Sequence, residues 1–187
     1  MGRSTVSSKE RMIDSAVKLL ATRGVAGTTI DGVLADSGAP RGSVYHHFPG
    51  GREELITTAA RAAGANMSAF FRQDDGPVHP REALAQFAKF WRALLAASDY
   101  RTGCPIVALT VGGADQIAAA SQIADEVFTG WQEQYRQLLA AHGFPPARAT
   151  SLATLSVAAI EGAVILARAQ RSAAPLDDVI AELSALV

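Results

Sequence analysis

Three consecutive residues, Arg41, Gly42 and Ser43, carry groups that suit contact with the edge of a nucleic-acid base. An arginine can donate two hydrogen bonds to guanine, and a serine hydroxyl can donate to or accept from a base or a phosphate. A glycine between them lets the backbone approach closely. Arg41 in isolation would be an ordinary solvated arginine, so its role depends on the element that presents it.

Tyr45, His46 and His47 follow directly, and such polar and aromatic side chains are typical of residues that lie beside backbone phosphates. The two histidines could instead be metal ligands. Successive residues of a helix point about 100° apart, however, and neither histidine has a Glu or His four residues away. We therefore expect phosphate contacts from these three residues, and we expect neither a metal site nor a cofactor.

The elements that must position these residues are short helices. Residues 8–23 have apolar side chains at helical spacing, which predicts a first helix. Thr28 and Asp31 have the spacing of a capping box, which predicts that a second helix begins there. That helix must stop quickly, because Gly38 tolerates a left-handed backbone and Pro40 suits the first turn of a new helix.

A third helix is predicted over about residues 40–47, with Val44 and Phe48 on one face. Two short helices joined by a turn that contains glycine indicate a helix-turn-helix motif. The second helix of such a motif enters the major groove of DNA, and its first residues contact base edges. The backbone amides that begin the second and fourth helices are expected to anchor further phosphates, near Thr28, Thr29 and Arg52.

The remainder of the chain is also predicted to be helical, because no stretch alternates convincingly with period two. The expected fold is all-α, with a three-helix head over residues 1–50 and a helical ligand-binding and dimerisation domain over residues 51–187. A long helix over about residues 51–73 links the two. Later helices are expected from about Pro80, from about Pro105, around Ile123 to Leu138, over residues 147–171 and over residues 175–187.

The composition agrees with a folded helical protein. Of the 187 residues, 49% are hydrophobic, and about one in five is alanine, the residue with the highest helix propensity. No unbroken apolar run approaches the roughly 18 residues that span a bilayer, and the first ten residues lack the apolar core of a signal peptide. We therefore expect a cytoplasmic protein.

The net charge of −1, taken over the whole chain, argues against a nucleic-acid partner. Divided along the chain, however, residues 1–64 carry a net charge of +2 and the remainder carries −3. This asymmetry is weak evidence, but it fits a DNA-facing head joined to an acidic body.

The stretches that surround these residues resemble the DNA-binding signature of TetR-family transcriptional repressors. The resemblance covers about residues 8–64 and is carried by Thr28-Thr29-Ile30 through Ser37-Gly38, by Arg41-Gly42-Ser43-Val44-Tyr45-His46-His47-Phe48, and by Arg52-Glu53-Glu54-Leu55. It implies a dimer that binds a palindromic operator and releases it when a small molecule binds. It also implies base contacts from Arg41, Gly42 and Ser43, and phosphate contacts from Thr29, Tyr45, His47 and Arg52. The Gly103-Cys104-Pro105 stretch is similar to a TetR subgroup related to lincomycin-resistance repressors.

Aromatic residues at helical spacing in the body are candidates for a cavity that binds a small apolar or aromatic effector. Their alternative role is to fill a core, because pockets and cores share the same lining chemistry. The candidate ligand-binding residues are Met67, Phe70, Phe87, Trp91, Cys104, Phe128, Trp131 and Tyr135.

Cys104 is the single cysteine, so it forms neither an internal disulfide nor a zinc site by itself. A position before Pro105 at the start of a helix would lower the pKa of the thiol and suit a redox sensor. The alternative is an inert, small apolar side chain. A small helical enzyme acting on an apolar ligand near Cys104 is a second functional hypothesis, and a sensor with a vestigial head is a third.

Two amphipathic helices at the end of the chain suit either packing within the chain or a four-helix interface between two copies. Small residues in the first of them would let another helix approach closely, which favours dimerisation. The candidate interface residues are Leu152, Leu155, Ala159, Gly162, Ala163, Leu166, Val179 and Leu183.

Overall fold

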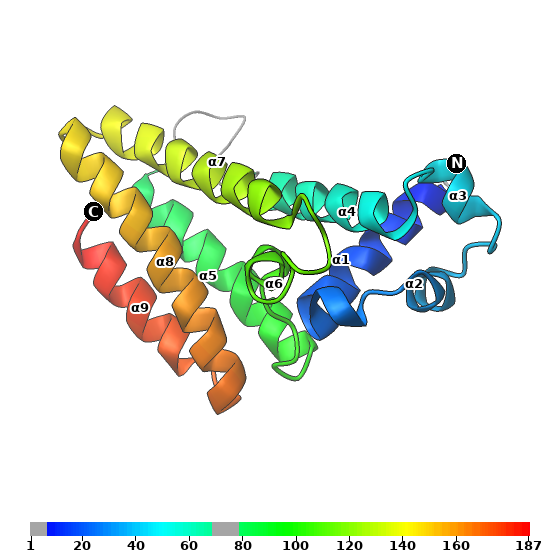
Figure 1. Ribbon diagram of the computed structural model, residues 1–187. Helices are drawn as coiled ribbons and strands as arrows, with labels where there is room; N and C mark the ends of the chain where they lie inside the picture. Colours follow the sequence, from blue (N-terminus) through cyan, green and yellow to red (C-terminus); the bar gives the residue numbers. More distant parts are fainter. Residues whose placement is uncertain (1–6, 69–78) are drawn as a thin grey trace, which may run out of the picture. The chain divides into compact units, whose positions relative to one another are not determined.

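Helices make up the regular structure of the computed structural model, which describes residues 7–68 and 79–187 (Figure 1). No strand occurs within these two ranges, so the expected all-α fold is confirmed. The helices found there are α1 (Ser8–Gly27), α2 (Ile30–Ser37), α3 (Ser43–His47), α4 (Gly51–Ser68), α5 (Pro80–Ala97), α6 (Pro105–Thr110), α7 (Ala120–Ala141), α8 (Pro146–Gln170) and α9 (Ala174–Ala185).

The chain forms two compact units. The first consists of residues 1–64 and 105–124, and the second of residues 65–104 and 125–187. The division therefore falls within α4 and within α7, so each of these helices continues from one unit into the other. The sequence patterns did not indicate that residues 105–124 pack with the head. A functional boundary near residue 50 stays a prediction.

In the first unit, α1 packs against α2, α3 and α6. The apolar stripe of α1 lies against the inward faces of these helices, because burial of these side chains is the main favourable contribution to packing. The buried residues of this core include Met12, Ala16, Leu19 and Leu20 from α1, Val33 from α2, Val44 from α3, Phe48 and, from α6, Ile106 and Leu109.

The connection between α1 and α2 differs by one residue from the predicted capping box. Gly24 has a φ of 69°, which interrupts α1 close to its predicted end. Thr28 is buried, and its hydroxyl donates to the carbonyl of Gly24 at 2.8 Å, so it closes α1. Thr29 is the N-cap of α2, because its side chain accepts a hydrogen bond from the amide of Gly32. The prediction that the cap lies at Thr28 was wrong.

Helix α3 is shorter than predicted. It spans Ser43–His47, whereas Pro40, Arg41 and Gly42 form a turn that precedes it. The amide and the hydroxyl of Ser43 both donate to the carbonyl of Pro40, at 2.9 and 2.6 Å. These bonds span three residues rather than four, and the low helix propensity of glycine at position 42 also opposes extension of α3 toward its N-terminus.

In the second unit, α9 packs against α5 and α8 (Figure 1). Prolines lie in the first turns of α5, α8 and α9, as the sequence predicted for α5 and α9. The side chain of His79 caps α5 by accepting from the amide of Arg81. The core of this unit includes Trp91, Leu95, Leu139, Ile160 and Leu176.

Helix α8 is apolar and long enough to cross a membrane, judged by length and composition, with a mean hydropathy of 1.7 over an 18-residue window. The expectation that no segment approaches this limit rested on unbroken apolar runs, and Glu161 interrupts the run in α8. A core helix of a soluble protein meets the same criterion. Within the second unit, α8 packs against α5 and α9.

Candidate nucleic-acid interface and apolar cavity

Helix α3 presents one polar face to solvent. Val44 and Phe48 are almost fully buried, whereas Tyr45 is 64% exposed and His46 is exposed. The two apolar residues lie four apart on one face, so they attach α3 to the core and leave its other face free. A short helix held in this way can enter a groove of DNA with its exposed side chains leading.

Arg41 lies in the turn before α3 and is paired with Asp31 of α2. The guanidinium and carboxylate are 2.5 Å apart, and the two side chains are 82% and 75% exposed. An ion pair in such contact with water contributes little to stability. Arg41 can therefore leave Asp31 for a base or a phosphate at low cost. Sequence reasoning assigned Asp31 to the capping box and missed this pairing.

The histidines and the serine of this segment are partly engaged within the head. The Nε2 atom of His47 lies 3.1 Å from the hydroxyl of Ser8, and the ring of His46 packs edge-on against that of His47. Ser43 is half-buried and bonded to Pro40, so its hydroxyl is used within the turn. His46 and Tyr45 thus remain the most accessible of the predicted contact residues in α3.

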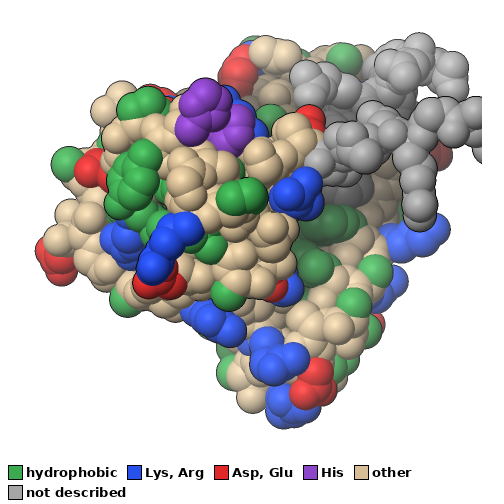
Figure 2. Space-filling model, turned by 90° about the vertical axis from the view of Figure 1, so that its right-hand side faces the viewer, with side chains coloured by type: hydrophobic (Ala, Val, Ile, Leu, Met, Phe, Trp, Pro, Cys, Tyr) green, Lys and Arg blue, Asp and Glu red, His purple; other side chains and the backbone are tan. Residues whose placement is uncertain are grey.

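Charge on this part of the surface is dispersed. The face drawn in Figure 2 carries histidine side chains and several separate Lys and Arg side chains, with Asp and Glu side chains between some of them. Lys18 is paired with Asp36 at 2.5 Å, in addition to the pair formed by Arg41 and Asp31. No group of three or more His, Cys, Asp or Glu side chains in the described ranges could hold a metal ion.

The side chains at two of the predicted phosphate contacts are engaged or buried within the head. The Nε and Nη2 atoms of Arg52 donate to the carbonyls of Thr28 and Val25, at 2.8 and 2.5 Å. Nη2 also contacts Gln116 at 3.3 Å. This arginine therefore satisfies carbonyls at the end of α1. Thr28 is 1% exposed, so its hydroxyl is not accessible to a phosphate, whereas Thr29 is exposed. Phosphate contacts from the backbone amides near these residues and near Arg52 stay a prediction.

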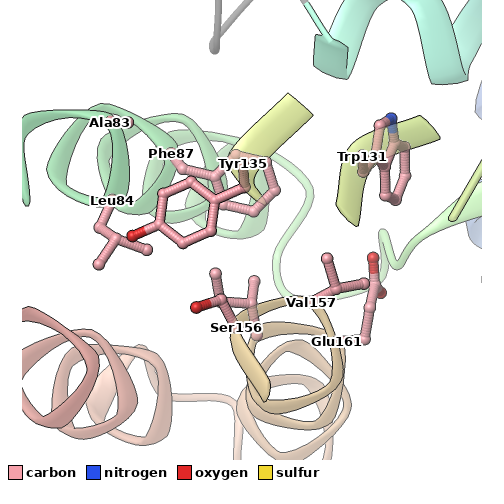
Figure 3. Close-up of a pocket in the computed structure, with 9 residues that line it drawn as sticks. Ala83, Leu84, Phe87, Trp131, Tyr135, Ser156, Val157 and Glu161 are labelled. Carbon is pink, nitrogen blue, oxygen red and sulfur yellow. The ribbon is translucent and has the colours of Figure 1, made fainter. Parts of the chain in front are cut away.

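A largely apolar cavity lies in the second unit among α5, α7 and α8 (Figure 3). Its free volume is about 30 Å³, room for one or two water molecules. Three predicted ligand-binding residues line it, namely Phe87, Trp131 and Tyr135. The lining residues that sequence reasoning missed are Ala83, Leu84, Ser156, Val157, Ile160 and Glu161.

The other predicted ligand-binding residues do not line this cavity. Trp91 is 2% exposed and belongs to the core, where its ring packs edge-on against Phe90. Phe128 is half-buried and packs against Trp131, with ring centroids 5.5 Å apart. Met67 is half-buried near the end of α4, and Phe70 lies outside the described residues.

Glu161 is the one residue with a carboxyl side chain among those that line the cavity. The residue is 9% exposed, and burial raises the pKa of its carboxyl to about 7, although a hydrogen bond from Cys104 opposes this shift. Its Oε2 atom has no hydrogen-bond partner among the described residues. Cys104 is buried and is not among the residues that line the cavity.

Tyr135 and Ser156 supply further polar groups to the cavity. Burial raises the pKa of the Tyr135 phenol, and a hydrogen bond with Ser156 partly offsets this effect. In Figure 3 the Tyr135 hydroxyl points toward Leu84, whereas the Glu161 carboxyl points toward Trp131. The two polar groups therefore lie at different places along an otherwise apolar wall.

One side of α8 is apolar and exposed. Leu155 and Leu166 are 46% and 49% exposed, and Ala159 and Gly162 lie on the same side of α8 between them. Val179 and Leu183 of α9, with Leu155 and Ala159, line an open groove. Leu152 and Ala163 are each 1% exposed, so these two predicted interface residues instead pack within the chain.

Comparisons with known proteins agree across both units. Residues 12–59 match the sequence model of the tetR family of bacterial regulatory proteins, and residues 80–182 match the C-terminal domain of LmrA/YxaF-like transcriptional regulators. An HTH-type transcriptional regulator of Mycobacterium tuberculosis is 40% identical over 96% of this chain and 93% of its own. The HTH-type transcriptional regulator LmrA of Bacillus subtilis is 27% identical over 90% of each chain.

Solved structures share the fold. A regulatory protein TetR from Rhodobacter sphaeroides superposes with a TM-score of 0.81 at 21% identity, covering 95% of this chain and 97% of its own. A TetR transcriptional regulator from Legionella pneumophila superposes with a TM-score of 0.82 at 18% identity, covering 97% of each chain. At these identities the likeness concerns the fold alone.

Proposed function

The chain belongs to the TetR family of bacterial transcriptional regulators, with an LmrA/YxaF-like C-terminal domain, and on that premise we propose that it is a ligand-responsive repressor. As a dimer it binds a palindromic operator through α3 and the turn before it. A small apolar or aromatic effector in the cavity of the second unit releases the DNA. The observation that carries the proposal is the exposed face of α3, held by buried Val44 and Phe48 beside a weakly paired Arg41.

Operator recognition follows from the chemistry of this face. Arg41 can exchange Asp31 for two hydrogen bonds to guanine, and Gly42 permits close approach because it is exposed and has no side chain. Tyr45, His46 and Thr29 are exposed for phosphate contacts. A helix of five residues covers only a few base pairs, so two heads are needed for a specific site.

The response to an effector requires a physical connection between cavity and head. Cys104 bonds to Glu161 in the cavity wall, and the next residue, Pro105, begins α6, which packs on α1 of the head. Helices α4 and α7 also continue from one unit into the other. An effector that binds one arrangement of these elements more tightly than the other weakens DNA binding by that difference in affinity.

The enzyme hypothesis and the hypothesis of a sensor with a vestigial head have different outcomes. The relatives are transcriptional regulators, so the enzyme hypothesis is set aside. Cytoplasmic location is proposed because the operator of a bacterial regulator lies on DNA in that compartment. A sensor with a vestigial head remains as the alternative, and the DNA-binding experiment below distinguishes it.

The test uses an operator selected from random duplexes with the wild-type protein, or DNA flanking its own gene. We expect Arg41→Ala to lower affinity for this operator by about tenfold or more, because a bidentate contact to guanine contributes roughly 1–3 kcal/mol. Fluorescence anisotropy of a labelled duplex measures the affinity. The melting temperature should stay unchanged, because the ion pair with Asp31 is exposed.

Arg148→Ala is the matched control, since this exposed arginine lies in the first turn of α8, in the other unit. It should leave operator affinity unchanged. Equal affinity of wild type and Arg41→Ala would remove Arg41 from base recognition. A wild-type protein that binds no duplex would favour the vestigial head.

A further inference from the structure

We propose that the cavity among α5, α7 and α8 binds a lipophilic cation, meaning an apolar or aromatic body that carries one protonated amine, and that Glu161 selects the charge. The inference rests on the proposed function, because it names the chemical class of the effector for the same cavity.

The Glu161 carboxyl is buried and has few hydrogen-bond partners. Its Oε2 atom is buried and has no hydrogen-bond partner among the described residues, and Cys104 offers the carboxyl one weak donor. A buried carboxylate without adequate partners carries a large desolvation cost. A ligand that brings a donor and a positive charge removes both deficits at once. Buried polar atoms are almost always hydrogen-bonded, so an unpartnered carboxylate oxygen in a cavity wall points to a ligand as its partner.

The residues that line the cavity around Glu161 carry no positively charged side chain. The cavity contains no Lys or Arg among its lining residues, so no cation of the chain competes for Glu161 there. The titratable group bonded to the carboxyl is the Cys104 thiol, from the segment before α6, whereas the Tyr135 phenol of α7 lines the same cavity at a different place. Neither group is positively charged. The lining residues from α5 are the apolar Ala83, Leu84 and Phe87.

Aromatic side chains form part of the cavity wall. Phe87, Trp131 and Tyr135 line the cavity, and Figure 3 shows the Glu161 carboxyl directed toward the side where Trp131 lies. Aromatic faces attract cations, most strongly where water is excluded. An amine held by the carboxylate therefore also gains from the ring, and the apolar remainder of the ligand packs against α5.

The small free volume sets a condition on binding. About 30 Å³ accommodates an ammonium group but not an aromatic body, so the lining side chains must move to admit the rest of the ligand. Such movement at Glu161 displaces its partner Cys104, next to α6. Binding of this class of ligand is thereby coupled to the element that contacts the head.

The test compares three probes that share one apolar body: phenylpropylamine, phenylpropanol and phenylpropionate. Isothermal titration calorimetry at about pH 8, where Glu161 is ionised, should show the amine binding about tenfold or more tightly than the alcohol, and the acid most weakly. In Glu161→Gln the amine and the alcohol should bind about equally. Glu126→Gln, which changes an exposed carboxyl of α7, should retain the preference for the amine.

Acidification gives a second readout that needs no variant. At about pH 5 the Glu161 carboxyl is protonated, so the preference of wild type for the amine should fall toward that of Glu161→Gln. Thermal melting establishes that Glu161→Gln is folded. The proposal is overturned if none of the probes binds, if the alcohol binds as tightly as the amine, or if Glu161→Gln keeps the preference.

The same probes added to the protein–operator complex separate this inference from the proposed function. Binding of the amine that depends on Glu161 but leaves the complex intact would uphold the ligand class and contradict effector-controlled release. Release of operator by the alcohol and the amine at equal concentrations would uphold release and contradict the selection of charge.

Discussion

The sequence pattern and the folded structure indicate different roles for Glu161. Its position in an apolar run of α8 indicated only a long helix for packing or dimerisation, because the neighbouring Ile160 and Ala163 are typical core residues. Folding places its carboxyl in a buried wall beside Cys104. A lone acid inside an apolar helix was the available signal, since such residues are rarely buried unless they have a partner or a function.

The raised pKa of Glu161 predicts a pH dependence of stability. The carboxyl titrates near its ordinary value of 4.5 when unfolded and at about 7 when folded, so the folded protein binds more protons between these values. Stability should therefore fall as pH rises from 4.5 to 7, by at most about 3 kcal/mol, and then level off. Glu161→Gln should lose this fall.

Urea denaturation at a series of pH values measures the effect, with Glu126→Gln as the control that keeps the wild-type slope. A parallel course of wild type and Glu161→Gln across this range would show that the carboxyl titrates normally. It would also contradict the proposal that Glu161 selects the ligand by its charge, because that selection requires a desolvated carboxyl.

At the level of secondary-structure elements, the side chain of Arg52 joins the end of α1 to the start of α4. Its hydrogen bonds to the carbonyls of Val25 and Thr28 predict a structural role. Arg52→Ala should destabilise the protein by about 2–3 kcal/mol, since hydrogen bonds from charged donors contribute about this much and the carbonyls lose their partner. Chemical denaturation measures the change.

Arg61→Ala, an exposed residue on the same helix, serves as the comparison and should cost much less stability. If Arg52→Ala is as stable as wild type, the structural role is contradicted. If, in addition, the slope of log affinity for the operator against log salt concentration falls by about one, Arg52 contacts a phosphate as the sequence predicted.

Helix α6 is the element whose placement periodicity could not predict. The sequence indicates a short helix after Pro105, but its pattern is equally suited to the body and to the head. Burial of Ile106 and Leu109 against α1 assigns it to the head. The contact joins segments about a hundred residues apart, and no local pattern specifies which distant apolar face a helix of six residues will cover.

At the scale of the whole molecule, the exposed stripe of α8 predicts the assembly. Leu155 and Leu166 expose apolar surface on one side of the helix, next to the small residues Ala159 and Gly162. A second copy that packs α8 and α9 against the same helices would bury this stripe and form a symmetric four-helix interface.

The double substitution of Leu155 and Leu166 by glutamate should convert the dimer to a monomer, because it would bury unpaired charges in the interface. Sedimentation velocity measures the mass. Affinity for a palindromic operator should fall with it, since one head makes half of the contacts. Ala96→Glu, on an exposed position of α5, should leave the assembly intact. A double variant that stays dimeric would place the interface elsewhere.

The helical class, most helix positions and the motif that carries DNA recognition could be predicted from the sequence. These features depend on local chemistry: alanine-rich periodic segments form helices, glycine and proline end them, and a short polar segment from Arg41 to His47 is readable at fixed spacing. Which of the candidate residues lie together became evident only from the folded chain. Folding buried Thr28, Leu152 and Trp91, engaged Arg52 with α1, and brought Glu161 beside Cys104, because burial and pairing depend on contacts between segments far apart in the chain.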